Sequence, residues 1–229
     1  MKAADLSDLR LRQLISPNLP TGAFTYSQGL EWAVECGWIK NSAETKKWLQ
    51  SILNDNQRYL ELPLLARLYT AVKNNEEEKF HHWSQQLFSS RETLEFRNEE
   101  KQRARALYSV LNKLPDAENW LELKTWKVAL LNSQLSSYAL AANRWNITLP
   151  NLMQAHVWSW LENTVAAAIK LVPLGQSEGQ SLLFELSNEI DEVVEYALQV
   201  KDDEIGASSP ALAIVSSLHE TQYSRLFRS

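Results

Sequence analysis

The sequence is poor in cysteine, glycine and proline. Its 229 residues include one cysteine, Cys36, six glycines and seven prolines. A single cysteine excludes a disulfide framework within the chain, which fits a reducing compartment. An all-β protein of this length would need many more turn-forming residues. These absences favour an all-α protein.

The chain also lacks a long uncharged apolar run and an excess of positive charge. The first residues, MKAADLSDLRLRQL, carry charges from Asp5 to Arg12, where a signal peptide needs an apolar stretch. The segment 145–161 is interrupted by Pro150 and several polar residues, so it is a poor membrane span. The net charge of −5 argues against a general nucleic-acid binder. We therefore expect a cytoplasmic protein without a membrane or nucleic-acid partner.

What the chain does contain is apolar residues at helical spacing, in steps of three and four. Three such stripes are Trp158, Leu161, Val165, Ala168 and Val172; Leu183, Leu186, Ile190, Val193 and Ala197; and Leu212, Val215, Leu218 and Leu226, the last interrupted by Gln222. Ser208-Ser209-Pro210 is typical of an N-cap followed by proline in the first turn. The pattern predicts one domain, 1–229, a bundle of roughly eight to ten helices. Within it, 208–229 forms a C-terminal helix and a tail. Nine tryptophans are interpreted mainly as large core aromatics.

Motifs for catalysis are incomplete. His219-Glu220 begins the H-E-x-x-H zinc pattern, but Tyr223 stands where the second imidazole is needed, one helical turn away. Gly175 and Gly179 lack the Lys-Ser or Lys-Thr pair of a P-loop and are explained by a tight turn into a helix. We expect no catalytic residue, no metal ligand and no cofactor. The alternative that stays open is a metal-dependent helical hydrolase that uses His219 and Glu220.

The densest charged run is SRETLEFRNEEKQRARAL, Ser90–Leu107. On a helix, Arg91 would pair with Glu95 and Glu99 with Arg103, each four residues apart. The favoured interpretation is a solvated helix with weak ion pairs, and the alternative is a charged docking face. Lys170 follows an apolar helical stripe, where a cation complements the helix C-terminus or meets a partner's anionic group.

Four blocks of the sequence carry a resemblance when they are taken together. They are LISPNLPTGAFTYSQGLEWAVECGW (Leu14–Trp38), RETLEFRNEEKQRARAL (Arg91–Leu107), WSWLENTVAAAIKLVPLGQSEGQ (Trp158–Gln180) and HETQYSRLFRS (His219–Ser229). In their order and spacing they resemble the UreF family of urease accessory proteins over essentially the whole chain. Two departures are Ala23, where many relatives have a second glycine, and a more basic Arg103-Ala104-Arg105.

The resemblance implies an all-α, two-fold homodimer that acts in urease maturation as a scaffold and not as an enzyme. Such a protein bridges a second accessory protein, UreD (also called UreH), and the nickel-carrying GTPase UreG. It controls GTP hydrolysis by UreG and helps to insert nickel into apo-urease. The resemblance implies that the C-terminal tail binds UreD, with buried anchors and cations at Tyr223, Arg225, Leu226, Phe227 and Arg228. The UreG-facing side would include Lys170, Gln176 and Gly179.

Overall fold

The computed structural model describes residues 3–206 and 209–229, and it confirms the all-α class: these residues contain α-helices, short 3-10 turns and a π-helical segment, without strands. Thirteen α-helices are present in this described part, and ten of them have eight or more residues. The α-helices are α1 (Ala3–Ile15), α2 (Leu30–Glu35), α3 (Ser42–Ile52), α4 (Leu62–Lys73), α5 (Glu77–Ser89), α6 (Leu94–Leu111), α7 (Glu122–Thr125), α8 (Lys127–Asn132), α9 (Gln134–Arg144), α10 (Leu149–Leu171), α11 (Gln176–Ser187), α12 (Ile190–Ala197) and α13 (Pro210–His219).

Side-chain caps set the starts of several helices. Asn41 accepts a hydrogen bond from the amide of Glu44 at the start of α3, and Thr93 accepts one from Phe96 at the start of α6. Ser133 does the same for α9. Each cap satisfies an amide that has no partner within its own helix. Pro210 occupies the first turn of α13 as expected; Ser209 is the N-cap residue without a side-chain cap bond, and Ser208 lies outside the described residues.

A π-helical segment, Leu53–Glu61, joins α3 to α4 without a break. The physical reason lies in Pro63, which has no amide hydrogen and crowds the carbonyl four residues earlier. That carbonyl belongs to Tyr59, and it accepts a hydrogen bond from the amide of Gly206 at 3.1 Å instead. At the end of the segment the amide of Leu62 bonds to Gln57, five residues back. The wider turn brings Asn56, Gln57 and Glu61 into the interior.

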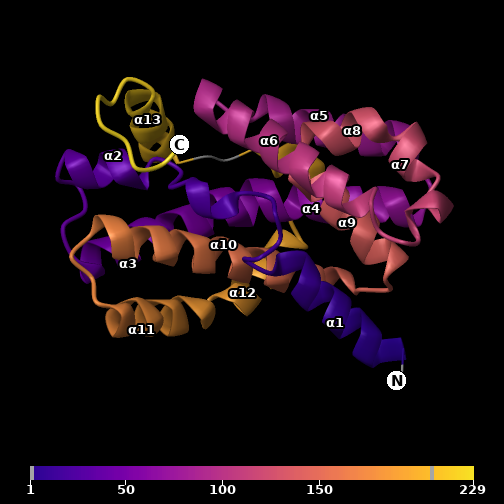
Figure 1. Cartoon of the computed structure of the whole chain (residues 1–229), viewed down its shortest axis with the longest axis horizontal. Coiled ribbons are helices and arrows are strands. Elements are labelled where there is room, and N and C mark those ends of the chain that lie inside the picture. The colour runs from indigo at the N-terminus through magenta and orange to yellow at the C-terminus, as the bar shows by residue number, and fades with distance from the viewer. Residues whose placement is uncertain (1–2, 207–208) are drawn as a thin grey trace.

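The apolar core is one connected cluster of buried side chains. Helices α4 and α9 lie against each other at its centre, and α5 and α6 pack on them. Helix α10 runs along the opposite side and carries α11 and α12 (Figure 1). Among the described helices, none combines the length and apolar character that crossing a bilayer requires.

The predicted stripes correspond only in part to the helices that form. The first stripe is buried in α10 from Leu161 to Ala168. The second is divided between α11 and α12, because the chain turns at Asn188 and Glu189. The third was wrong beyond Leu218, since α13 ends at His219. Of the nine tryptophans, Trp38 and Trp158 are exposed, and the other seven are buried or half-buried.

Candidate functional site

The C-terminal tail, residues 220–229, is folded back onto the body of the protein. Helix α13 packs against α2 and α6, and the tail then runs over the same two helices (Figure 1). The approach of α13 to α2 depends on Gly29, which has a positive φ of 79°. A Cβ at Gly29 would lie 2.5 Å from the Cγ2 atom of Val215 in α13. Any larger residue at this position would push the two helices apart.

A buried carboxylate on α2 receives the backbone of the tail. Glu31, with 7% of its surface exposed, accepts hydrogen bonds from the amides of Leu226 at 2.6 Å and Phe227 at 2.9 Å. The Nε2 atom of His219 lies 3.2 Å from the same carboxylate. Hydrogen bonds to an ionised acceptor are stronger than neutral ones, so Glu31 holds an otherwise irregular segment in place.

A second carboxylate, on α6, binds side chains of the same region. Glu95 lies 2.7 Å from the Nδ1 atom of His219 and accepts a hydrogen bond of 2.7 Å from Arg225. Glu220 accepts hydrogen bonds from the amides of Leu94 and Glu95 at the start of α6. Amides at a helix N-terminus lack partners in the helix and favour an anion. These contacts draw the chain away from the helical path after His219, which explains why α13 ends there.

The last residues are fixed as firmly as the rest of the tail. The amide and hydroxyl of Ser27 both donate to the carbonyl oxygen of Ser229, at 2.7 and 2.6 Å. The hydroxyl of Ser229 donates to Glu99 at 2.9 Å, and the amide of Arg228 donates to the carbonyl of Thr25. The tail is therefore an ordered part of the fold.

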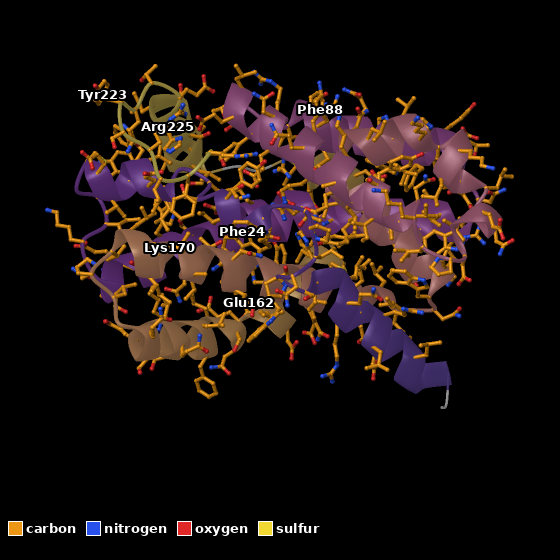
Figure 2. All side chains as sticks on the ribbon, in the orientation of Figure 1. Phe24, Phe88, Glu162, Lys170, Tyr223 and Arg225 are labelled. Atoms are coloured by element: carbon orange, nitrogen blue, oxygen red, sulfur yellow. The ribbon has the colours of Figure 1, made fainter. Side chains whose placement is uncertain are left out.

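The residues expected to bind UreD take up two different positions. The side chains of Tyr223 and Leu226 are 105% and 66% exposed, and Figure 2 shows Tyr223 at the outer edge of the tail. Phe227 is buried against the body, where the ammonium group of Lys170 lies 5.6 Å from its ring centre. Arg225 is paired with Glu95, and Arg228 reaches Gln102 at 3.3 Å. Of these five residues, Tyr223 and Leu226 are the two with exposed apolar side chains.

The residues expected on the UreG side come from two neighbouring helices. Lys170 is exposed in the last turn of α10, and Gln176 is exposed as the first residue of α11. Gly179 is buried inside α11, where a Cβ would lie 2.4 Å from the Cδ1 atom of Ile169. It therefore allows α10 and α11 to approach closely, a role that differs from the tight turn expected from the sequence.

The interpretation of the charged run as a solvated helix was wrong. Glu99 and Glu100 on α6 are only 4% and 7% exposed. Arg91 precedes α6 and pairs with Glu61 and Glu100, both at 2.6 Å, and not with Glu95. The predicted pair between Glu99 and Arg103 is present at 2.9 Å. The charged residues of this run form an internal ion-pair network, which also includes Glu61 from outside the run.

The pKa values of this network follow from burial and pairing. Burial raises the pKa of Glu61, but Arg91 and the nearby His156 outweigh it and hold that pKa well below the ordinary value. Burial lowers the pKa of Arg91, yet Glu61 and Glu100 raise it further above its usual range. A cavity of about 60 Å³ lies beside these groups and is also lined by Tyr138. The network ties the π-helical segment to α6 and α9.

The hydrolase alternative finds no support in this geometry. Both ring nitrogens of His219 face carboxylates, and the Glu220 carboxylate is turned toward the amides of α6. Within residues 3–206 and 209–229, no group of three or more His, Cys, Asp or Glu side chains is arranged so that it could hold a metal ion.

Glu31 was not identified from the sequence as a functional residue. A carboxylate within the apolar run LEWAV was a usable indication of a buried hydrogen-bond acceptor.

The fold and the site define an all-α protein whose C-terminal tail is held on the body by buried carboxylates. Comparison with known proteins identifies the family of this chain. A model of the UreF family matches residues 39–187. The chain is 55% identical to a urease accessory protein UreF of Alcanivorax borkumensis, over 96% of this chain and 97% of the relative. It is 46% identical to one of Pseudomonas putida, over 99% of both, and 43% identical to one of Citrobacter koseri, over 96% and 97%. The chain belongs to the UreF family of urease accessory proteins, which supports a role in urease maturation.

Proposed function

We propose that this chain is a non-catalytic scaffold of urease maturation, a homodimer that bridges UreD and the GTPase UreG. It regulates GTP hydrolysis by UreG and helps to deliver nickel to apo-urease in the cytoplasm. The observation that carries the proposal is the ordered tail, which exposes Tyr223 and Leu226 while its backbone is fastened to Glu31.

The tail suits a partner such as UreD because its exposed groups are preorganised. Large aromatic side chains are frequent at the energetic centres of protein interfaces. A segment that is already ordered loses less conformational entropy on binding than a free chain end. Tyr223 and Leu226 are the contact residues in this proposal, while Phe227, Arg225 and Arg228 hold the tail in position.

The UreG side is assigned to the end of α10 and the start of α11. Lys170 supplies the cation and Gln176 supplies hydrogen-bonding groups, while Gly179 sets the spacing of the two helices. Lys170 also lies over the ring of Phe227, so the two surfaces meet at one contact. That proximity supports a role in which UreD and UreG bind side by side on this protein.

The proposal is tested by size-exclusion chromatography with light scattering. The protein is run alone, with UreD, and with UreD, UreG, nickel and GTP. We expect a dimer that grows stepwise, and we expect the Tyr223→Ala, Leu226→Ala double variant to remain a dimer that no longer binds UreD. Phe184→Ala is the matched control, because Phe184 is 73% exposed on α11, away from the tail (Figure 1). A chain that stays alone under every condition would contradict the proposal.

A further inference from the structure

We infer that His219 is a positioning residue that clamps the partner-binding tail through two carboxylates at once. The inference rests on the proposed function, because it takes the tail as the segment that meets UreD. His219 does not contact the partner in this account. It fixes the orientation of the groups that hold the tail.

The geometry places one imidazole between two helices and the tail. The ring is fully buried, with Nε2 3.2 Å from an oxygen of Glu31 on α2 and Nδ1 2.7 Å from an oxygen of Glu95 on α6. The same two carboxylates also bind the tail. Glu31 accepts from the amides of Leu226 and Phe227, and Glu95 accepts from Arg225.

The charged groups around the imidazole ring determine how many hydrogen bonds its two nitrogens must donate. Glu31 faces it from α2 and Glu95 from α6, while Arg225 of the tail neutralises Glu95 from the other side. The neighbouring Glu220 carboxylate is directed at the amides of α6. Carboxylates only accept hydrogen bonds, so both ring nitrogens donate only in the doubly protonated imidazolium. The singly protonated ring leaves one carboxylate facing a lone pair, and that carboxylate then loses its fixed orientation.

The position of the tail affects the affinity for a partner, because only molecules with a docked tail can bind it. For a partner that recognises the docked tail, the apparent affinity is the intrinsic affinity multiplied by the fraction of molecules whose tail is docked. A clamp that keeps the tail docked therefore raises affinity without touching the partner.

The test is amide hydrogen exchange by NMR on the full-length protein, read at Leu226 and Phe227. We expect His219→Gln to accelerate exchange at these two amides by about tenfold or more, because glutamine carries both of its N–H donors on one nitrogen and cannot occupy the positions of both Nδ1 and Nε2. Ser216→Ala is the matched control on α13: Ser216 is fully buried, and its hydroxyl lies 2.7 Å from that of Thr93 and is bonded to neither of the carboxylates that hold the tail. It should change the tail amides by less than about threefold.

The selectivity of the effect separates a clamp from general packing. In His219→Gln, exchange should accelerate at Leu226 and Phe227, while the amides of the core helices α4 and α9 keep their wild-type rates. Unchanged exchange in His219→Gln, or an equal acceleration in Ser216→Ala, would overturn the inference. Should His219→Gln fail to fold, Glu95→Gln removes one side of the clamp and should give the same selective acceleration.

The failure of the clamp and the failure of the proposed function give different results. If Tyr223→Ala abolishes UreD binding while His219→Gln leaves tail exchange unchanged, the clamp is wrong and the UreD assignment stands. If His219→Gln loosens the tail and the Tyr223→Ala, Leu226→Ala double variant still binds UreD with full affinity, the clamp stands and the UreD assignment is wrong.

Discussion

Two carboxylate networks among the described residues differ in the cation that lies between their two carboxylates. The interior network joins Glu61 and Glu100 through Arg91, whose guanidinium stays charged at every pH at which proteins fold. The tail network joins Glu31 and Glu95 through His219, whose two ring nitrogens face one carboxylate each. The first holds helices together, and the second holds an irregular segment by its backbone. The contrast separates an element that stabilises the whole fold from one that fastens a single segment.

The largest loss of stability is expected from a substitution that breaks the interior network. Arg91→Ala leaves Glu61 and Glu100 without their shared cation, and such a loss typically costs about 3–5 kcal/mol. We expect a corresponding fall in the free energy of unfolding, measured by chemical denaturation. A change below about 1 kcal/mol would show that this network does not hold the helices together.

Acid should weaken the same network in a defined direction. The folded-state pKa of Glu61 lies below its ordinary value of 4.5, so its ion pairing stabilises the fold above that pH. Stability should then fall as the pH drops below about 4.5, because the unfolded chain takes up the proton first. Glu61→Gln should flatten this part of the pH profile of unfolding. A profile with the same slope in both proteins would exclude Glu61 as its source.

The tail network should respond locally. Glu31→Gln weakens the hydrogen bonds to the amides of Leu226 and Phe227, at a cost of about 1–3 kcal/mol to docking of the tail. We expect trypsin to cleave after Arg225 at least tenfold faster, while the unfolding midpoint of the rest changes little. Equal losses in the tail and the core would mean that the two networks are not independent.

The sequence predicted much of the fold because helical periodicity is local. The stripe of α10 and the charge pair of Glu99 with Arg103 depend on residues three or four positions apart. The tail site could not be predicted in this way. His219 meets Glu31 and Glu95, which are 188 and 124 positions away, and buried Glu99 meets Ser229, which is 130 positions away.

A smaller effect is expected at the surface assigned to UreG. Gly179→Ala would ordinarily stabilise a helix interior by roughly 0.5–1 kcal/mol. Here the new Cβ would lie 2.4 Å from Cδ1 and 2.8 Å from Cγ1 of Ile169, and such overpacking costs about 1–3 kcal/mol. We expect a net loss of about 1 kcal/mol in thermal unfolding. A stabilised variant would show that Ile169 can move aside.

The smallest effect on stability is expected where the tail faces outward. The side chain of Tyr223 is fully exposed, so Tyr223→Ala should change the free energy of unfolding by less than about 0.5 kcal/mol. Differential scanning calorimetry checks this value. A clear loss of stability would place Tyr223 among the residues that hold the tail, together with Phe227.

The most direct test of the account is a calorimetric titration of UreD with the wild type and with Tyr223→Ala. The account predicts that the variant, folded and as stable as the wild type, binds UreD at least tenfold more weakly, which corresponds to about 1.4 kcal/mol. Phe184→Ala should bind as the wild type does. Equal affinity of all three proteins for UreD would contradict the claim that the docked tail presents the partner-binding surface.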